Sequence, residues 1–455
     1  MAAREQWSSQ WGFMLAAMGS AIGLANMWRF PYSAGVSGGG AFVLVYLGAV
    51  LLLAMPLLMA ELLVGRRGQA TPTLSIARVA RDSGGSRAWV AMGYGGILAA
   101  ILIFGFYSVV GGWALSYVVL TGSGSLHGMS GEQLQTSFER LTADPLWMLL
   151  AYSTFLGSTV AISSFGIQRG VERAVKLLMP ALFVMLLGMV AYAAVTGEFL
   201  QALRFLFTPD FASITPTVVL DAFGQAFFSL SVGLTNLMAY GAYMSTTTSI
   251  PRASMIIVGA DTLVALLAGM AIFPIIFAHN LEPSSGPGLV FMSLPIVFGS
   301  VQGGALLGSL FFLLLSFAAL TSALCMLEAP VSWLVDQRGW PRRRATLGIG
   351  ALVWTLGLLC VFSFSLLADV RPLGAIEYFA GMTFFDLFDF ITTRILSPLI
   401  GASIALFVGW AVTRAITSEE LGTDAGNLAY RAWLLAVRWL VPAVLALLCY
   451  SLLTG

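Results

Sequence analysis

Residues 19–31 read GSAIGLANMWRFP and place glycines, a serine, an asparagine, an arginine and a proline inside an apolar stretch. A helix that unwinds at Gly23 leaves backbone carbonyl and N–H groups unpaired, which lipid strongly penalises. Carbonyls at the end of a half-helix suit a hard cation such as Na⁺, and the N-terminal end of the following half-helix suits a carboxylate. The stretch therefore indicates a site for a zwitterion with co-bound cations.

A second stretch repeats this pattern. Residues 21–26 read AIGLAN and residues 231–236 read SVGLTN, so both follow the order small, branched, Gly, Leu, small, Asn. The two stretches lie in the first and sixth apolar segments, which open two successive sets of five. Because five is odd, the second set of segments enters the membrane from the opposite face, and this is the pattern of an inverted repeat. The alternative is a chance match of glycine and leucine.

Other polar residues lie within apolar segments. Thr321 and Ser322 belong to the eighth segment, Ser229 and Ser231 to the sixth, and Asp261 to the seventh. A buried Ser or Thr often only hydrogen-bonds to its own helix, and that alternative stays open for each of these four. A carboxylate at mid-membrane costs about 2.5–3.5 kcal/mol on insertion scales, so Asp261 favours a functional role.

Charged residues near these segments suggest two gates. Arg29 lies about one and a half helical turns beyond Gly23, where it could close over the site with Asp386 or Asp389. The alternative for Arg29 is snorkelling to the outer interface. On the opposite side, Arg4 and Asp336 could form an inner latch. The two pairs would then open and close in alternation.

The elements that position these residues must be membrane helices. The chain is 58% hydrophobic and only 9% charged, against roughly 25% charged in an ordinary globular domain. Lipid leaves the backbone no outside partners, and the runs lack the alternation of a membrane barrel. We expect eleven spanning helices at about 11–36, 41–65, 89–121, 147–165, 174–195, 218–243, 254–278, 304–335, 345–367, 380–411 and 428–453. The net charge of +1 gives no sign of nucleic-acid binding.

The loops predict an orientation. Of the 22 basic residues, 17 lie near the loops that share one side of the predicted spans, whereas the other side holds Arg140, Arg204 and Arg371. Basic residues gather on the cytoplasmic side of membrane proteins. We therefore expect a cytoplasmic amino terminus and, after an odd number of spans, an external carboxyl terminus.

Several motifs carry a resemblance to a known family. They are REQW at 4–7, GSAIGLANMWRFPY at 19–32, GGGAF at 38–42, ELLVGRRG at 61–68, GQAFFSLSVG at 224–233 and ALTSAL at 319–324. The chain resembles the neurotransmitter:sodium symporter family, in particular its bacterial amino-acid transporters with the leucine-transporter fold. The resemblance implies an all-α polytopic membrane protein of eleven helices in a bacterial cytoplasmic membrane. One domain, 1–455, would hold two inverted repeats, 8–195 and 216–412, with helices 1 and 6 unwound at mid-membrane, followed by helix 11 at 425–455.

The resemblance also implies two sodium sites. The first would use the carbonyl of Ala21, Asn26, Ser229 and the carboxylate of the substrate. Ala260 stands where the family has an asparagine, and the neighbouring Asp261 is the expected replacement. Because this carboxylate could supply the negative charge that chloride provides in some members, we expect no requirement for chloride. The second site would use the carbonyls of Gly19, Ile22 and Ala318 and the hydroxyls of Thr321 and Ser322.

The substrate pocket implied by the resemblance lies between these sites. Its lining would be Ala21, Leu24, Ala25, Ile103, Tyr107, Phe228, Ser229, Ser231, Leu234, Ser322 and Met326. The Tyr107 hydroxyl and the backbone of Leu24 and Ala25 would hold a carboxylate. No charge lines the side-chain end, so a neutral, apolar substrate is favoured. Ala25 replaces the glycine usual in the family's amino-acid transporters, and its methyl group would crowd the carboxylate or favour another substrate shape.

The same resemblance assigns the gates. The outer gate would be Arg29 with Asp386, or with Asp389 as second choice, under an aromatic lid of Tyr107 and Phe228. Gln225 resembles a residue that supports this gate, and Glu61 one that caps the unwound backbone of the sixth segment. The inner gate would consist of Arg4, Trp7, Tyr243 and Asp336.

We therefore expect a sodium-coupled symporter that imports a neutral, hydrophobic amino acid by alternating access. Its partners would be this small molecule, Na⁺ and the lipid bilayer, with no obligate protein partner. Two alternatives share the fold, namely a sodium-dependent transporter of another small carboxylate-bearing or amine solute and a non-transporting amino-acid sensor. A channel would need a continuous polar stripe. An enzyme is not expected, because there is no HExxH motif and neither His127 nor His279 lies near a plausible nucleophile.

Overall fold

The computed structural model describes residues 5–279, 290–291, 294–300 and 303–454, and these residues contain helices but no strand. The α-helices are α1 (Gln10–Ala21), α2 (Phe30–Val36), α3 (Gly40–Ala49), α4 (Met55–Gly68), α5 (Pro72–Asp82), α6 (Val90–Gly122), α7 (Gly131–Ala143), α8 (Pro145–Ser164), α9 (Arg173–Thr196), α10 (Phe199–Phe207), α11 (Pro216–Ser229), α12 (Asn236–Gly241), α13 (Ile250–Ala278), α14 (Leu294–Ser300), α15 (Gly304–Arg338), α16 (Arg342–Phe362), α17 (Phe384–Asp389), α18 (Ser397–Leu406), α19 (Arg414–Leu421), α20 (Leu428–Leu435) and α21 (Val441–Thr454). Short π-helical turns are η1 (Ala25–Arg29), η2 (Val50–Ala54), η4 (Ile167–Glu172), η8 (Phe390–Leu396), η9 (Phe407–Ala411) and η10 (Ala436–Leu440), and 3₁₀ turns are η3 (Arg87–Trp89), η5 (Phe211–Ser213) and η7 (Glu377–Phe379).

Nine continuous helical runs in the described residues are long and apolar enough to cross a membrane. They are Gly40–Gly68, Arg87–Gly122, Pro145–Ser164, Ile167–Thr196, Ile250–Ala278, Gly304–Arg338, Arg342–Phe362, Phe384–Ala411 and Leu428–Ser451. The two remaining predicted spans, 11–36 and 218–243, are the ones in which the helix is interrupted. Together the nine runs and the two interrupted spans account for the eleven expected segments, so the predicted all-α fold class is confirmed.

The first interruption separates α1 from η1. Ile22 leaves the helix with φ −71° and ψ 102°, and the helix resumes at Ala25. The Asn26 Oδ1 atom accepts a hydrogen bond from the Gly23 N–H at 3.0 Å, so a side chain replaces the missing helical partner. A Cβ atom on Gly23 would lie 2.6 Å from the Ser322 Oγ atom. Only glycine therefore lets the broken segment approach α15 this closely.

The second interruption separates α11 from α12. Ser231, Gly233 and Thr235 have φ angles of 51°, 83° and 59°, in the left-handed region that side chains other than glycine rarely adopt. A Cβ atom on Gly233 would lie 2.9 Å from the Ser397 carbonyl oxygen, which explains the glycine. Because these turns lack the regular backbone hydrogen bonds of a helix, other groups must pair with their N–H and carbonyl groups.

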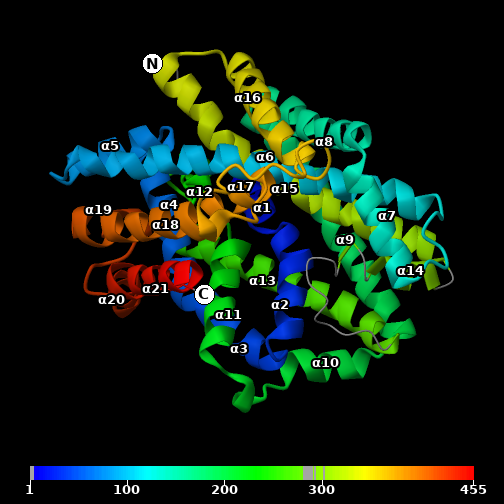
Figure 1. The fold of residues 1–455 in the computed structure, drawn as a ribbon. Helices are drawn as coiled ribbons and strands as arrows, with labels where there is room; N and C mark the ends of the chain where they lie inside the picture. The colour runs from blue at the N-terminus through cyan, green and yellow to red at the C-terminus, as the bar shows by residue number, and fades with distance from the viewer. Residues whose placement is uncertain (1–4, 280–289, 292–293, 301–302, 455) are drawn as a thin grey trace.

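The two interrupted segments lie in the middle of the molecule. Figure 1 shows α1 and α12 close to the centre, with α16 and α8 beyond α6 on one side and α20 and α21 on another. α15 packs along α6 and also contacts α1 and α12. The side chains of Ala17, Ala21 and Ile22 are buried, as expected for a segment that faces protein rather than lipid. The polar interruptions therefore lie inside a shell of continuous helices.

Candidate functional site

A cavity of about 540 Å³ lies where the two interruptions face α6, α15 and the span that contains η8. It is lined by Ala21, Gly23, Leu24, Ala25, Ile103, Phe106, Tyr107, Phe227, Phe228, Ser231, Val232, Leu234, Ser322, Met326, Thr393 and Ser397. Ten of the eleven residues predicted to contact substrate belong to this lining, and Ser229 does not. None of the described residues in the lining carries a charge. The cavity is therefore suited to a neutral, apolar group.

The polar end of the cavity lies at the first interruption. A Cβ atom on Gly23 would lie 3.3 Å from the Tyr107 hydroxyl, so this hydroxyl faces the unwound backbone. Tyr107 is 8% exposed, and its hydroxyl faces Ser322 and the Leu24 backbone but makes no well-formed hydrogen bond to the part of the chain that the structure describes. A buried donor without a partner is costly unless a ligand or water satisfies it. An acceptor such as a carboxylate fits this position.

Four side chains meet beside the cavity, on the opposite side of the first interruption. The Asn26 Nδ2 atom donates to the Asp261 Oδ1 atom at 2.8 Å and to the Ser229 Oγ atom at 3.0 Å. Ser229 donates to the second Asp261 oxygen at 2.7 Å, and the Tyr46 hydroxyl lies 3.4 Å from the same oxygen. All four side chains are fully buried. This cluster (Asn26, Tyr46, Ser229 and Asp261) brings together three of the four residues predicted for the first sodium site.

The cluster holds a buried negative charge that no basic side chain compensates. Among the described residues, Asp261 makes no ion pair, and its hydrogen-bond donors are neutral. A buried carboxylate without a cationic partner is costly. A small cation bound among these oxygens would compensate the charge, and Asp261 thus stands where the sequence predicted a replacement ligand.

Carbonyl groups converge on α15 near the end of α1. The Ser322 Oγ atom lies 3.3 Å from the Gly19 oxygen, 3.2 Å from the Ser20 oxygen and 3.5 Å from the Ile22 oxygen. Thr321 lies beside them, since a Cβ atom on Gly19 would be 3.0 Å from its Cβ atom. The Thr321 hydroxyl donates to the Ala318 oxygen at 3.0 Å. Three residues predicted for the second sodium site, Gly19, Ile22 and Ser322, thus bring their oxygens together, and the other two, Ala318 and Thr321, lie beside them on α15. Oxygens are the ligands that hard cations prefer.

The second interruption is held by a carboxylate of the chain itself. The Glu61 Oε1 atom accepts the Gly233 N–H at 2.6 Å, and the Oε2 atom accepts the Met238 N–H at 3.3 Å. Glu61 is fully buried. The donors lie at the start of α12, where the partial positive charge of a helix end favours a carboxylate. Glu61 thus occupies the position that the sequence predicted for it.

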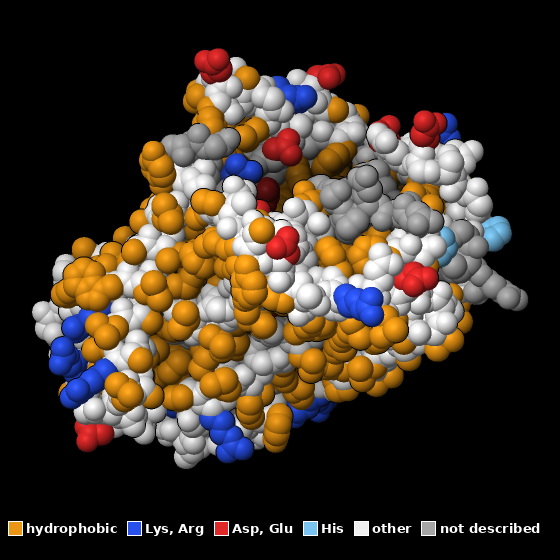
Figure 2. Space-filling view, turned by 90° about the horizontal axis from the view of Figure 1, so that it is seen from below, with side chains coloured by type: hydrophobic (Ala, Val, Ile, Leu, Met, Phe, Trp, Pro, Cys, Tyr) orange, Lys and Arg blue, Asp and Glu red, His pale blue; other side chains and the backbone are white. Residues whose placement is uncertain are grey.

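Arg29 lies above the cavity. Its guanidinium carbon is 4.5 Å from the centre of the Phe228 ring, and Phe228 is 38% exposed. Seen from below, the molecule is hollowed at a point where basic and acidic side chains lie together amid hydrophobic ones (Figure 2). Gln225, predicted to support Arg29, donates to the Ala25 carbonyl at 3.1 Å and so braces the first interruption.

The acidic partner of Arg29 differs from the first choice made from the sequence. Asp386 accepts hydrogen bonds from the Thr383 N–H at 2.9 Å and from its hydroxyl at 2.8 Å, and so it caps α17. Asp389 is the acidic group that interacts most strongly with Arg29, followed by Asp221. Because the Asp386 carboxylate is used in this cap, the geometry favours Asp389, the second choice made from the sequence, and the gate pair stays a prediction.

The opposite side of the site is closed by the amino-terminal segment. The Trp7 N–H donates to the Tyr243 oxygen and its Nε1 atom to the Tyr240 oxygen, both at 3.2 Å. The Tyr243 hydroxyl donates to Glu328, and Asp336 accepts the Thr71 N–H at 2.6 Å. Arg4, the fourth residue predicted here, lies outside the described residues. The site is thus shut on the Trp7 side and open toward Phe228.

Sequence reasoning missed several residues of the cavity wall. Phe106 and Val232 are next to predicted residues in the sequence. Thr393 and Ser397 belong to a span for which the sequence predicted only gate residues. Their spacing of four places them on one helical face, and this spacing is the signal that could have identified them. The Ser20 carbonyl was also missed, and it accepts from both Ser231 and Ser322 at 3.2 Å.

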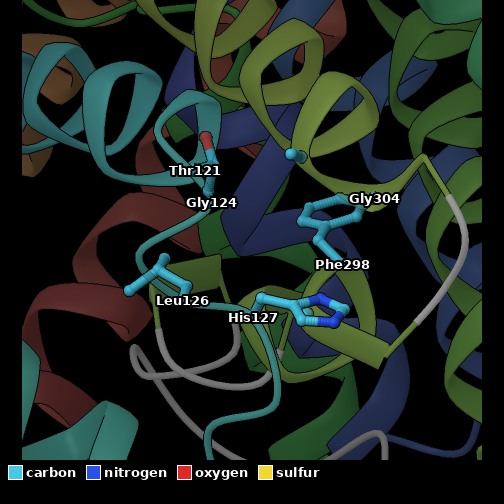
Figure 3. A pocket seen from close by; sticks show the side chains of 8 residues that line it. Thr121, Gly124, Leu126, His127, Phe298 and Gly304 are labelled. Carbon is cyan, nitrogen blue, oxygen red and sulfur yellow. The ribbon is translucent and has the colours of Figure 1, made fainter.

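A second, smaller hollow lies between the end of α6 and the start of α15. Its empty volume is about 230 Å³, and Thr121, His127 and Phe298 are among its lining residues (Figure 3). It holds one titratable side chain and lies far along α6 from Tyr107. The described residues contain no group of three His, Cys, Asp or Glu side chains that could hold a metal ion.

Comparisons with known proteins agree with this geometry. A family model described as the sodium:neurotransmitter symporter family matches residues 4–130 and 132–454. An uncharacterized sodium-dependent transporter, YhdH of Bacillus subtilis (strain 168), is 36% identical over 98% of this chain and 97% of its own length. The sodium-dependent nutrient amino acid transporter 1 of Drosophila melanogaster is 28% identical over 79% of this chain and 66% of its own length. The crystal structure of MhsT in complex with L-phenylalanine is 38% identical, with a TM-score of 0.88 over 99% of this chain and 100% of that one.

Proposed function

Because this chain belongs to the sodium:neurotransmitter symporter family, and is therefore a sodium-dependent transporter, we propose that it imports a neutral, hydrophobic amino acid by alternating access. One observation carries the proposal. An uncharged cavity has its unpartnered Tyr107 hydroxyl beside the unwound first segment, next to two groups of converging oxygens. MhsT, a solved structure similar to this chain, is described as a complex with L-phenylalanine, which supports an amino acid as the ligand.

The ends of the amino acid have complementary surroundings in the cavity. Its carboxylate would accept from the Tyr107 hydroxyl and from the backbone near Leu24 and Ala25. Its side chain would lie against the apolar wall that includes Ile103 and Met326. A charged side chain would lose its hydration without gaining a partner there, so acidic and basic amino acids are disfavoured. Met326 can adapt its shape, which suits bulky aliphatic and aromatic side chains.

Two sodium ions would couple to this substrate. One would bind in the cluster of Asn26, Ser229 and Asp261, and the other among the oxygens of Gly19, Ile22, Ala318, Thr321 and Ser322. Each ion would draw the first segment toward α13 or α15, because its ligands come from both sides. Binding would thereby order the interrupted segment that also holds the substrate carboxylate.

The fixed carboxylate of Asp261 would make chloride unnecessary. It lies fully buried beside Tyr46 and Ser229, where a bound anion would meet like-charge repulsion. Uptake should therefore continue unchanged when chloride is replaced by gluconate at constant Na⁺. A loss of uptake in gluconate would contradict this assignment.

The loop charges support a cytoplasmic amino terminus and an external carboxyl terminus. In this orientation the Trp7 side is cytoplasmic and the Phe228 side is external. The structure then has the outer side open and the inner side closed, as a transporter needs when it receives an external substrate.

The test is uptake of a panel of labelled amino acids into liposomes that contain the purified protein. We expect at least one neutral, apolar amino acid to accumulate under an inward Na⁺ gradient but not under a K⁺ gradient. Accumulation of no member of the panel, or accumulation indifferent to Na⁺, would contradict the proposal. A sensor of the same fold would bind a panel member in a Na⁺-dependent way without accumulating it.

A matched pair of variants tests the second sodium site. Thr321→Ala removes a buried hydroxyl beside Gly19 that donates to Ala318 at 3.0 Å, whereas Thr355→Ala removes an exposed hydroxyl that donates to Ala351 at 2.9 Å. We expect Thr321→Ala to raise the Na⁺ concentration for half-maximal uptake, and Thr355→Ala to leave it unchanged. Equal Na⁺ dependence in the two variants would remove Thr321 from the site.

A further inference from the structure

Four charged side chains, two of each sign, lie together above the cavity. Arg29 interacts with Asp389, Asp221 and Arg394, and Asp389 interacts with both arginines. None of the four makes an ion pair with another among the described residues, so no direct pair closes this side of the cavity. The group is neutral as a whole, although a simple gate needs only one charge of each sign.

Asp221 and Arg29 belong to the two interrupted spans. Asp221, Gly224 and Phe228 share one face of α11 because they lie three and seven residues apart. The Arg29 side chain lies on this face, with its guanidinium 4.5 Å from the Phe228 ring and an Nη atom 4.0 Å from a Cβ position built on Gly224. Asp221 is therefore the next side chain along the surface that Arg29 already contacts.

A hydrogen bond holds Asp221 in this position. The Ser37 hydroxyl, just beyond the end of α2, donates to the Asp221 Oδ2 atom at 3.3 Å. Ser37 and Arg29 both belong to the outer half of the first interrupted span, toward opposite ends of it. Asp221 therefore links α11 to both ends of that outer half. When α11 and the outer half of the first span move together, the distance between Asp221 and Arg29 stays the same.

Asp389 and Arg394 lie together on a different span. Asp389 ends α17, and the following turn η8 is π-helical, with hydrogen bonds between residues five apart. Residues five apart lie one above the other in such a turn, whereas in an α-helix they point in divergent directions. Arg394 is five residues beyond Asp389, and its guanidinium carbon is 5.4 Å from the Phe390 ring. The π-helical turn thus gives Asp389 its own basic neighbour.

We infer that the outer gate closes by an exchange of ion partners. In the open state Arg29 is shared between Asp389 and Asp221, and Asp389 is shared between Arg29 and Arg394, without a direct ion pair. Closure brings the two bodies together and forms a direct pair between Arg29 and Asp389 at the expense of the interactions with Asp221 and Arg394. Asp221 and Arg394 are positioning residues, and they stabilise the open state. The inference rests on the outer gate of the proposed function.

The exchange predicts that substitutions of Asp221 and Asp389, which both interact with Arg29, shift the equilibrium between open and closed gate in opposite directions. Asp389→Asn removes the partner gained on closure, so it favours the open gate. Asp221→Asn removes the partner lost on closure, so it favours the closed gate. Arg394→Gln should act in the same direction as Asp221→Asn. Pairs exposed to water contribute up to about 1 kcal/mol, so each change should shift the equilibrium by about 2- to 5-fold.

The measurement uses a cysteine inside the cavity. Ser397→Cys is introduced after the three native cysteines are replaced by alanine, and a membrane-impermeant thiol reagent is added outside intact cells in Na⁺ without amino acid. We expect the labelling rate to fall by about 2- to 5-fold in Asp221→Asn and Arg394→Gln and to rise in Asp389→Asn. Asp221→Glu, which keeps the charge, should restore the rate.

Asp210→Asn is the matched control. Asp210 also accepts a serine hydroxyl, that of Ser213 at 3.0 Å, but it does not interact with Arg29. Its labelling rate should equal that of the parent. In the Asp389→Asn background, Asp221→Asn should no longer slow labelling, because closure has no acidic partner to gain.

The inference is overturned if Asp221→Asn accelerates labelling, as Asp389→Asn does, or leaves it unchanged. It is equally overturned if Asp221→Asn slows labelling to the same extent in the presence and absence of Asp389. The labelling requires no transported substrate. A failure of amino-acid uptake would therefore remove the proposed substrate and leave this result standing.

Discussion

The two interrupted spans have similar sequences but are stabilised in different ways. The first, at Ile22–Leu24, is surrounded by hydroxyl, carbonyl and carboxylate oxygens that have too few positive partners. The second, at 230–235, is held by the buried carboxylate of Glu61 on the backbone N–H groups of Gly233 and Met238. Under the proposed function, mobile ions complete the first interruption, whereas the second carries a permanent ligand, the Glu61 carboxylate. Two segments of related sequence can in this way divide a site into a part whose ligands bind and leave and a part whose ligand belongs to the chain itself.

The two asparagines in the repeated pattern show the same contrast. Asn26 is hydrogen-bonded through both side-chain atoms, to Gly23, Ser229 and Asp261. Asn236 is 1% exposed, and neither of its side-chain atoms has a partner in the described part of the chain. The repeat therefore preserves the residue type but not its role.

The largest effect is expected from Glu61→Gln, which removes the permanent ligand. Hydrogen bonds to a charged group contribute about 1.5–3 kcal/mol each, so the free energy of unfolding should fall by about 3 kcal/mol and uptake should be lost. The loss of stability should be the same with and without Na⁺, because no ion bridges this interruption. Thermal unfolding in both salts provides the measurement. Glu139→Gln, at an exposed position of α7, should leave both quantities unchanged.

Asp261→Asn should have the next largest effect, and it should depend on Na⁺. Loss of a charged ligand beside a cation corresponds to about 1.5–3 kcal/mol, so the Na⁺ dissociation constant should rise by about 10- to 100-fold. Stability without Na⁺ should stay the same or increase, because a buried uncompensated charge disappears. Na⁺ titrations of unfolding temperature measure both effects. A Na⁺-independent loss of stability would erase the contrast with Glu61.

Tyr107→Phe should act on the substrate alone. The hydroxyl has no partner within the described chain, so its removal should leave Na⁺ binding without substrate unchanged. A lost hydrogen bond to a carboxylate corresponds to about 1.5 kcal/mol, or roughly tenfold weaker amino-acid binding. Equilibrium binding at saturating Na⁺ measures this change, and Tyr94→Phe on the exposed start of α6 is the control. Unchanged binding would move the carboxylate away from Tyr107.

The smallest effect is expected from Asn236→Ala. Because its side chain has no partner, replacement by an apolar group should alter uptake by less than about twofold. Asn26→Ala, at the corresponding place in the other span, should abolish Na⁺-dependent uptake. Parallel uptake assays of the two variants provide the test. Similar losses in both would mean that the second interruption also binds a mobile ligand.

The sequence predicted the fold and the location of the site because both depend on local composition. Gly23 and Asn26 mark the first interruption, and long apolar runs mark the continuous helices, since lipid forces every backbone group to be satisfied within its helix. Asp261 was identified because a carboxylate in an apolar segment is expensive to bury. Each of these features is visible within a short window of the chain.

The sequence could not choose between Asp386 and Asp389 because the choice depends on helix geometry. Asp386 forms a capping box with Thr383, and the π-helical turn after Asp389 shifts the direction of every residue that follows. Thr393 and Ser397 also line the cavity, and although their spacing of four marks one helical face, it does not say that this face meets the cavity. Register changes of this kind require three-dimensional coordinates.

The attachment of Trp7 has a consequence for the solvent. Both of its hydrogen bonds end on backbone carbonyls around the end of α12, at Tyr240 in its last turn and at Tyr243 just beyond it. When the amino-terminal segment moves away, these carbonyls and the two Trp7 N–H groups must find other partners, and water is the one available at this face, which is cytoplasmic in the proposed orientation. Water molecules are therefore reactants in inward opening. Osmolytes that lower water activity in the cytoplasm should slow the release step while leaving substrate capture from outside unaffected.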